Sequence, residues 1–209
     1  MAAAGFFDDA LLTKARAIIA SFERNAIAPD GRRPAAVAVV LLADGAGQAC
    51  FLLTLRAASL RAHAQQWALP GGRIETGETA ELAALRELQE EVGLVRGEES
   101  VLGLLDDYGT RSGFIITPVV VWGGGEVELR MNPNEVAAVY RVPLTQLERP
   151  GVPTMTRIPE SSRPVIHLPL LSTEIYAPTA AILYQMREVV MHGRSTRVDH
   201  LEQPVWAWR

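Results

Sequence analysis

The chain has 209 residues, of which 48% are hydrophobic and 21% are charged, and its net charge is −4 at pH 7. This composition is ordinary for a globular protein with a sizeable core, and the negative charge excludes a global electrostatic attraction to nucleic acid or an anionic membrane. The single cysteine, Cys50, excludes an intrachain disulfide. A chain with so little cysteine fits a reducing compartment, so we expect a soluble, cytoplasmic protein.

The N-terminal part of the chain is predicted to form a helix followed by a β-hairpin. Apolar residues recur at helical intervals from Asp8 to about Arg24, and the Pro and Gly residues of segment 28–34 then end the pattern. Segments 35–43 and 49–56 have the composition of strands, and a turn of sequence DGAGQ joins them. The run at 35–43 is the longest apolar run and is too short to span a bilayer.

The rest of the chain alternates between predicted helices and strands. Segment Thr79–Val92 has a helical pattern without Pro or Gly, and Gly93 follows it as a stop signal. A last helix is predicted at residues 178–190, with proline at its start, where proline is tolerated. Segment 157–170 is predicted to be a loop that leads into a strand. Three further segments are predicted strands: 101–108, 114–122 and 136–144.

This order of elements predicts one domain of the α/β (α+β) class, with a mixed β-sheet sandwiched between helices. We expect residues 31–209 to form this domain and residues 1–30 to form an N-terminal helical extension. The sequence contains no internal repeat and no linker long enough to separate two domains.

The predicted helix at 79–92 carries three carboxylates close together. Glu87 is three residues before Glu90 and four residues before Glu91, so the three side chains share one side of the helix. Like charges at this spacing cost roughly 0.2–0.5 kcal/mol per pair. We expect the three glutamates to point away from the apolar stripe of the helix, toward a cleft.

Two explanations of this acidic cluster are open from the residues alone. It could be a solvated surface of the helix, or it could bind a hard divalent cation, which prefers carboxylates and substrate phosphates as ligands. Gly71 and Gly72 precede the helix, and glycines let the backbone approach a ligand closely. These glycines favour the second explanation.

The residues around the cluster resemble the motif of the Nudix hydrolases at every fixed position: Gly72, Glu78, Arg86, Glu87, Leu88, Glu90, Glu91, Gly93 and Leu94. The resemblance implies a Nudix fold in which this motif forms a loop, a helix and a second loop. It also implies hydrolysis of a nucleoside diphosphate linked to another group, with Mg²⁺ or Mn²⁺ as cofactor.

The same resemblance implies roles for individual residues. The metal ligands would be Glu87, Glu90, Glu91 and the carbonyl group of Gly71. Glu78 and Arg86 would more often form an ion pair that braces the loop. The base that accepts a proton from the attacking water stays open between Glu87 and Glu135, because relatives differ in where this carboxylate lies.

The stretch from Leu52 to Gly72 is similar to the signature of the coenzyme A pyrophosphatase branch of the Nudix enzymes. The matching positions are Leu52, Leu53, Thr54, Arg56, Ala57, Arg61, Pro70, Gly71 and Gly72. Gln65 stands where that branch has Gly, and Leu69 stands where it has Phe. The similarity implies that Arg56, Arg61 and Gly72 bind substrate, although Arg56 could instead be a surface charge at a strand end and Arg61 could form a salt bridge in a loop.

The implied reaction is hydrolysis of coenzyme A, or of an acyl or oxidised derivative, to 3′,5′-ADP and the 4′-phosphopantetheine moiety. One alternative is a Nudix pyrophosphatase acting on an ADP-sugar, a dinucleotide or an NTP. Another is a binding module without catalysis, against which the three glutamates argue. The expected partner is a small nucleotide derivative, not nucleic acid or a membrane, and a homodimer stays open.

Overall fold

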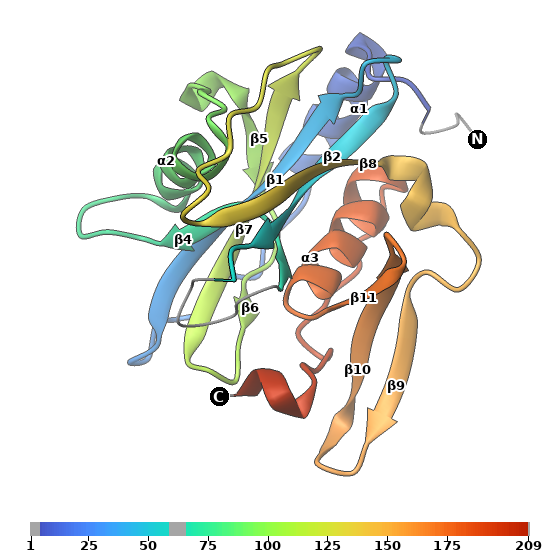
Figure 1. The fold of residues 1–209 in the computed structure, drawn as a ribbon. Coiled ribbons are helices and arrows are strands. Elements are labelled where there is room, and N and C mark those ends of the chain that lie inside the picture. Colours follow the sequence, from blue (N-terminus) through green and yellow to red (C-terminus); the bar gives the residue numbers. More distant parts are fainter. Residues whose placement is uncertain (1–4, 59–65, 209) are drawn as a thin grey trace.

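The computed structural model describes residues 5–58 and 66–208, and its central feature is a mixed β-sheet (Figure 1). Strand β1 (Arg33–Ala43) runs antiparallel to β2 (Ala49–Arg56), which confirms the predicted hairpin. On its other side β1 runs parallel to β7 (Phe114–Gly124) over almost its whole length. The mixed sheet predicted from the sequence is therefore confirmed.

The remaining strands of this sheet extend it on both sides of β1. Strand β3 and strand β8 pair with β2, β4 pairs with β1, and β5 and β6 pair with β7. Their bounds are Trp67–Ala68 for β3, Gly71–Arg73 for β4, Val101–Leu104 for β5, Tyr108–Gly109 for β6 and Val136–Pro143 for β8.

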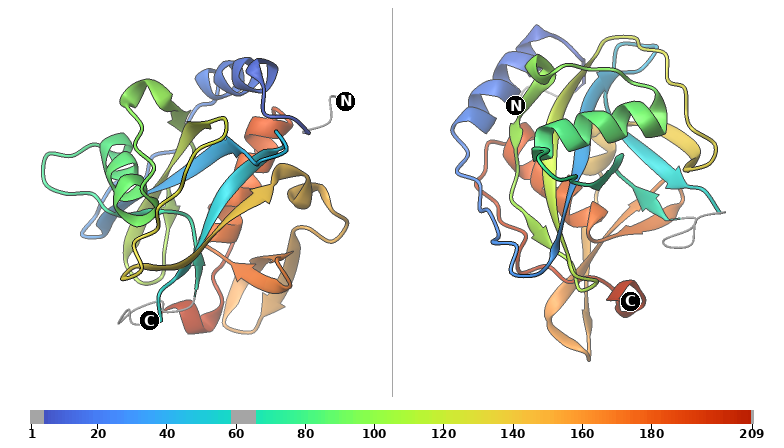
Figure 2. Two further views of the ribbon diagram at one scale, coloured as in Figure 1. Left: turned by 45° about the horizontal axis from the view of Figure 1, so that its top comes forward. Right: turned by 90° about the vertical axis from the view of Figure 1, so that its left-hand side faces the viewer.

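Helices cover both faces of the sheet, as Figure 2 shows. Helix α2 (Ala80–Val92) packs on one face, and helices α1 (Asp9–Ala20) and α3 (Thr179–Met186) contribute to the core on the other face. Because β1 is covered on both faces, almost all of its residues are buried, and its sequence is a continuous apolar run. None of the described helices has both the length and the apolar character needed to cross a membrane.

A second, three-stranded sheet lies beside the first one. It consists of β9 (Thr154–Ile158), β10 (Ser161–Leu170) and β11 (Thr173–Tyr176), all antiparallel. The prediction of a loop at the start of segment 157–170 was wrong, because residues 154–170 form a hairpin. Most side chains of β9 are exposed, so this strand has no alternation of apolar and polar residues that a sequence pattern could detect.

The predicted strand 101–108 is also interrupted, because β5 ends before two buried aspartates. Asp106 accepts a hydrogen bond from the backbone N–H of Asn25 (2.7 Å), and Asp107 accepts one from that of Ile27 (2.8 Å). Arg24 also pairs with Asp107. A buried carboxylate needs such partners. The two aspartates therefore leave the sheet and fix the segment that follows α1.

The segment before the C-terminus is fixed by one buried carboxylate, Glu202. Its side chain is 2% exposed, and it accepts hydrogen bonds from Arg111 Nη2 (2.6 Å) and Ser161 Oγ (2.9 Å). Burial raises the pKa of Glu202, but the hydrogen bonds from Arg111, the Gln203 N–H and Ser161 outweigh this effect and leave the pKa below its usual value. The ionised form of Glu202 therefore stabilises the fold.

We expect Glu202→Gln to lower the free energy of unfolding by about 1–3 kcal/mol at neutral pH, because Arg111 loses its partner. The pKa of Glu202 is depressed in the folded state, so its contribution is present above the unfolded pKa of about 4.3 and is lost as the pH falls through the folded pKa. Urea unfolding of the wild type and of Glu202→Gln should show a difference in unfolding free energy that becomes smaller as the pH falls. The exposed Glu160→Gln serves as control, and a difference that stays constant down to low pH would contradict this role.

Candidate active site

Helix α2 begins and ends where the sequence predicted, because its caps are local. The Thr79 side chain accepts a hydrogen bond from the N–H of Leu82 (3.2 Å) at the N-terminus. At the other end Gly93 has a φ of 71°, and its N–H donates to the Gln89 carbonyl (2.9 Å). Only glycine adopts this left-handed conformation without cost, so the helix stops directly after Glu91 and Val92.

The three glutamates of α2 differ strongly in exposure. Glu90 is about half exposed, Glu87 has a side chain that is 13% exposed, and Glu91 is buried, at 3%. The expectation that all three point away from the buried side of the helix was therefore wrong for Glu91. Its Oε2 accepts a hydrogen bond from the Gly71 N–H (3.3 Å). Strand β4 passes beside the helix there, and it covers this carboxylate.

Burial makes two of these carboxylates hard to ionise. The pKa of Glu91 is raised to about 7, chiefly by burial and to a smaller extent by the charges of Glu87 and Glu135, while the charge of Arg56 opposes the rise. Burial also raises the pKa of Glu87, although Arg86 opposes this. A carboxylate with a raised pKa lacks compensating positive charge. A cation bound among these side chains would supply that charge.

Glu78 and Arg86 form the ion pair that the sequence suggested. Arg86 Nε lies 2.9 Å from Glu78 Oε1, and Nη2 lies 3.1 Å from Oε2, which is a two-pronged contact. Arg86 also donates to the carbonyl group of Arg73 (3.0 Å), and its Nη1 lies 2.8 Å from Glu87. The hydrogen bond from Arg86 lowers the pKa of Glu78. Arg86 therefore connects the loop before α2 to the acidic side of the helix.

Glu135 comes from a distant loop but lies within electrostatic reach of α2. The backbone N–H of Asn132 donates to the Glu91 carbonyl (2.9 Å), so this loop lies against the end of the helix. The Glu135 carbonyl accepts a hydrogen bond from Ala57, and its charge raises the pKa of both Glu87 and Glu91. Its role as a base stays a prediction, but the fold brings it to the acidic residues of α2.

The donor chemistry of this cluster fits a hard divalent cation, because carboxylate oxygens are the ligands such ions prefer. In the arrangement shown, arginines hold these carboxylates: Arg86 contacts Glu87 and Glu90, and Arg56 contacts Glu91. Within residues 5–58 and 66–208, no three His, Cys, Asp or Glu side chains converge as a ready-made metal cage. Binding with part of the ligands supplied by substrate phosphates suits such a site.

Strand β4 lies next to helix α2 and contains two adjacent glycines, Gly71 and Gly72. Gly71 pairs with Val37 and Gly72 pairs with Ala36 of β1. A Cβ atom on Gly72 would lie 2.1 Å from Glu87 Oε1, and one on Gly71 would lie 2.3 Å from the Ala36 carbonyl oxygen. Neither contact is possible unless a neighbouring atom moves, which for Gly72 is the end of a flexible side chain and for Gly71 is the main chain of β1. The two glycines therefore let the acidic helix approach the sheet.

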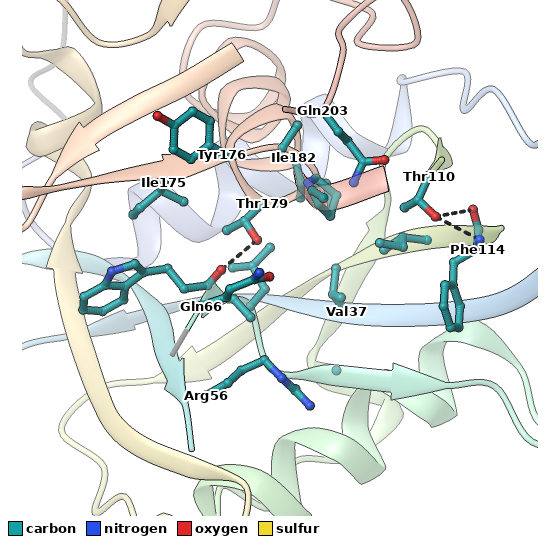
Figure 3. A pocket seen from close by; sticks show the side chains of 18 of the residues that line it. Val37, Arg56, Gln66, Thr110, Phe114, Ile175, Tyr176, Thr179, Ile182 and Gln203 are labelled. Carbon is teal, nitrogen blue, oxygen red and sulfur yellow. Dashed lines mark hydrogen bonds between the residues drawn. The ribbon is translucent and has the colours of Figure 1, made fainter. Parts of the chain in front are cut away.

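A pocket of about 440 Å³ lies beside these glycines and is lined mostly by apolar side chains (Figure 3). Arg56 lies on the side of the pocket nearer α2, while Ile175, Tyr176 and Ile182 lie on the opposite side. Trp206 also lines the pocket. Sequence reasoning assigned no residue of these walls, from β11, α3 and the segment near the C-terminus, to the site.

The structure places two of the three predicted substrate-binding residues at this pocket. Gly72 and Arg56 line it, and Arg56 Nη1 also lies 3.5 Å from Glu91 Oε1. Arg56 Nε is buried and has no hydrogen-bond partner within the described part of the chain. Arg61, and the departure from the signature at Gln65, lie outside the described residues. Arg56 therefore joins the pocket to the acidic cluster.

A solved structure has the same fold. A MutT/nudix family protein from Enterococcus faecalis superposes with a TM-score of 0.54 over 78% of this chain and 65% of that chain, at 18% sequence identity. At this identity the likeness shows a shared fold alone.

Two relatives named "Uncharacterized Nudix hydrolase NudL" match the sequence itself. The protein from Photorhabdus laumondii is 37% identical over 56% of this chain, and the protein from Cronobacter sakazakii is 42% identical over 48% of it. The matches cover 62% and 53% of the length of these two relatives, so the chain spans only part of the curated relatives it matches.

The NUDIX domain model matches residues 32–165, which include β1, the glycines of β4, helix α2 and Glu135. This match covers more than half of the chain. It includes every residue of the acidic cluster and the loop that brings Glu135 to it. The chain therefore belongs to the Nudix family.

Proposed function

We propose that this Nudix protein hydrolyses the diphosphate bond of coenzyme A, or of an acyl or oxidised derivative. The products would be 3′,5′-ADP and the 4′-phosphopantetheine moiety. One observation carries the proposal: Gly71 and Gly72 lie between a pocket of about 440 Å³ and the acidic helix, and Arg56 both lines the pocket and contacts Glu91. Arg56 and the two glycines belong to the stretch that is similar to the coenzyme A pyrophosphatase signature.

The shape of the site supports a substrate with a charged centre and a larger organic part. The pocket has the size and the mainly apolar lining of a small-molecule site. A diphosphate at Gly71 and Gly72 would meet backbone groups and Arg56 on one side and the carboxylates of α2 on the other. Since carboxylates repel phosphate, this position requires a cation between them.

Nudix hydrolases generally need divalent metal ions, and we propose Mg²⁺ or Mn²⁺ here. Glu87, Glu90 and Glu91, together with the carbonyl group of Gly71, would hold the ion. Such an ion, when bound, neutralises charge on phosphate oxygens and makes water more acidic. Arg86 positions Glu87 and Glu90, since it contacts both carboxylates.

The chemical step is attack by water on a phosphorus atom of the diphosphate. The new P–O bond forms as the bond to the bridging oxygen breaks, and the proton of the water passes to a carboxylate. Glu87 and Glu135 are the two candidates for this base, and the electrostatic influence of Glu135 on Glu87 and Glu91 supports its candidacy. Arg56 would hold the phosphate in place while the bond breaks.

A substrate panel tests this proposal directly. Purified protein with Mg²⁺ would be given coenzyme A, ADP-ribose, diadenosine polyphosphates and dNTPs, and the products would be identified by mass spectrometry. We expect the highest kcat/KM for coenzyme A or an acyl derivative, release of 3′,5′-ADP, and no turnover after chelation with EDTA. Coenzyme A as the poorest of the four substrates would refute the assignment, and binding without turnover would indicate a non-catalytic module.

A further inference from the structure

Three side chains from neighbouring strands gather on the pocket side of the sheet. Arg33 of β1 is paired in register with Phe114 of β7, and Ala35 of β1 is paired with Arg73 of β4. Because side chains alternate along a strand, Arg33 and Ala35 lie on the same face, and their paired neighbours lie on that face too. The register therefore brings Arg33, Phe114 and Arg73 together.

The two arginines stack on the aromatic ring. Arg33 Cζ lies 3.9 Å and Arg73 Cζ lies 5.9 Å from the ring centre of Phe114, which is within the range of cation–π contacts. This contact restrains the guanidinium groups, while their N–H groups lie in the guanidinium planes and do not take part in the contact with the ring face. Arg33 uses one of them, since its Nη2 donates to the carbonyl group of Ser112 (2.9 Å).

Neither arginine is paired with an acidic group of the residues that the structure describes. Within the described part of the chain, no carboxylate lies within 4 Å of Arg33 or Arg73, and the guanidinium of Arg73 makes no hydrogen bond there. Many other arginines of this acidic protein are paired with carboxylates, among them Arg24, Arg56, Arg86, Arg111, Arg187 and Arg197. Two adjacent cations without counter-charge repel each other, so the pair is suited to an anion from outside.

The position of this pair connects it to the proposed reaction site. Arg73 directly follows Gly72, and both Arg73 and Phe114 line the pocket. The hydroxyl groups of Thr110 and Ser112 lie 3.1 Å apart and line the same part of the pocket. An anion here would be close to the glycines, but it would be on the face of the sheet that is opposite to the acidic cluster of α2.

We propose that Arg33 and Arg73, held on the ring of Phe114, bind a phosphate monoester of the substrate that is distinct from the diphosphate being cleaved. This inference rests on the proposed function, and it names the 3′-phosphate of coenzyme A as the group that is recognised. A phosphate monoester carries close to two negative charges at neutral pH and has three acceptor oxygens. Two guanidinium groups match that charge and number of acceptors better than they match a carboxylate, which one arginine can satisfy.

Arg73→Gln and Arg33→Gln test this role by comparing two substrates that differ only in the monoester. For coenzyme A we expect each substitution to lower kcat/KM by about 10-fold or more, as for loss of a charge-assisted hydrogen bond. For 3′-dephospho-coenzyme A the value should change by less than about 3-fold, and wild type should prefer coenzyme A. Arg73→Lys should restore part of the loss, and the exposed Arg157→Gln on β9 should change neither substrate. Equal losses on both substrates would overturn the inference.

A binding measurement without metal separates this inference from the proposed function. With EDTA present, calorimetry would compare adenosine 3′,5′-bisphosphate with AMP, which lacks the 3′-phosphate. We expect wild type to bind the bisphosphate at least about 10-fold more tightly, and Arg73→Gln to remove this preference. If coenzyme A is not hydrolysed but this preference exists and depends on Arg73, the anion site stands and the proposed reaction fails. If coenzyme A is hydrolysed but wild type shows no preference, the reaction stands and the anion site is refuted.

Discussion

Glu90→Gln is expected to reduce the metal-dependent kcat/KM for the nucleotide substrate by about 10²–10³-fold, the loss typical for removal of one electrostatic group from an active site. The substitution keeps the size of the side chain and removes only its charge. Glu90 is about half exposed and its only ion-pair partner among the described residues is Arg86. The fold therefore loses little, and the free energy of unfolding should change by less than about 1 kcal/mol.

The control for this substitution lies on the same helix. Glu81→Gln removes a carboxylate from the first turn of α2, and it should leave kcat/KM unchanged. A titration of activity with Mg²⁺ and with Mn²⁺ should show weaker metal activation for Glu90→Gln than for Glu81→Gln. If both variants behave like wild type at every metal concentration, Glu90 is a solvated surface charge and has no part in metal binding.

The helix that carries these residues could be predicted well, because its signals are local. Thr79 caps one end and Gly93 ends the other, and both residue types act within one turn of the helix. The burial of Glu91 could not be predicted in this way. It depends on β4, which reaches the helix only because residues 71–73 pair with β1. A helical pattern places residues around an axis but does not say which neighbouring strand will cover them.

The walls of the pocket could be predicted from the sequence even less well than the burial of Glu91. The motif placed Gly72 and Arg56 at one side of it, but Tyr176 and Trp206 come from parts of the chain more than 100 residues further on. Tyr176 and Trp206 meet edge to face, with ring centres 5.6 Å apart. Neither residue stands in a pattern that the sequence alone would link to a substrate. Tyr176 belongs to the second sheet, and Trp206 follows the segment that the Glu202 contacts hold, so tertiary contacts bring this wall to the site.

Gly71→Ala is expected to destabilise the protein by about 2–4 kcal/mol, measured by urea unfolding, because the added methyl group meets main-chain atoms. The new Cβ would lie 2.3 Å from the Ala36 carbonyl oxygen and 2.7 Å from Val37 Cα. These atoms belong to the buried strand β1 and cannot move without disturbing the sheet. Gly71 does not have a positive φ, so backbone strain is not the cause of this effect.

Gly72→Ala is the matched comparison, because its added methyl group meets a side chain instead. The new Cβ would lie 2.1 Å from Glu87 Oε1, and the carboxylate end of Glu87 can rotate away at modest cost to stability. We expect a loss of less than about 1.5 kcal/mol in unfolding free energy, but a fall in kcat of about 100-fold, since a displacement of about 1 Å at a reacting group has an effect of this size. A Gly72→Ala protein with full activity would show that the position of Glu87 against β4 does not matter for catalysis. If Gly72→Ala destabilised the protein as much as Gly71→Ala does, Gly72 would be required by the packing of the sheet and not by the acidic helix.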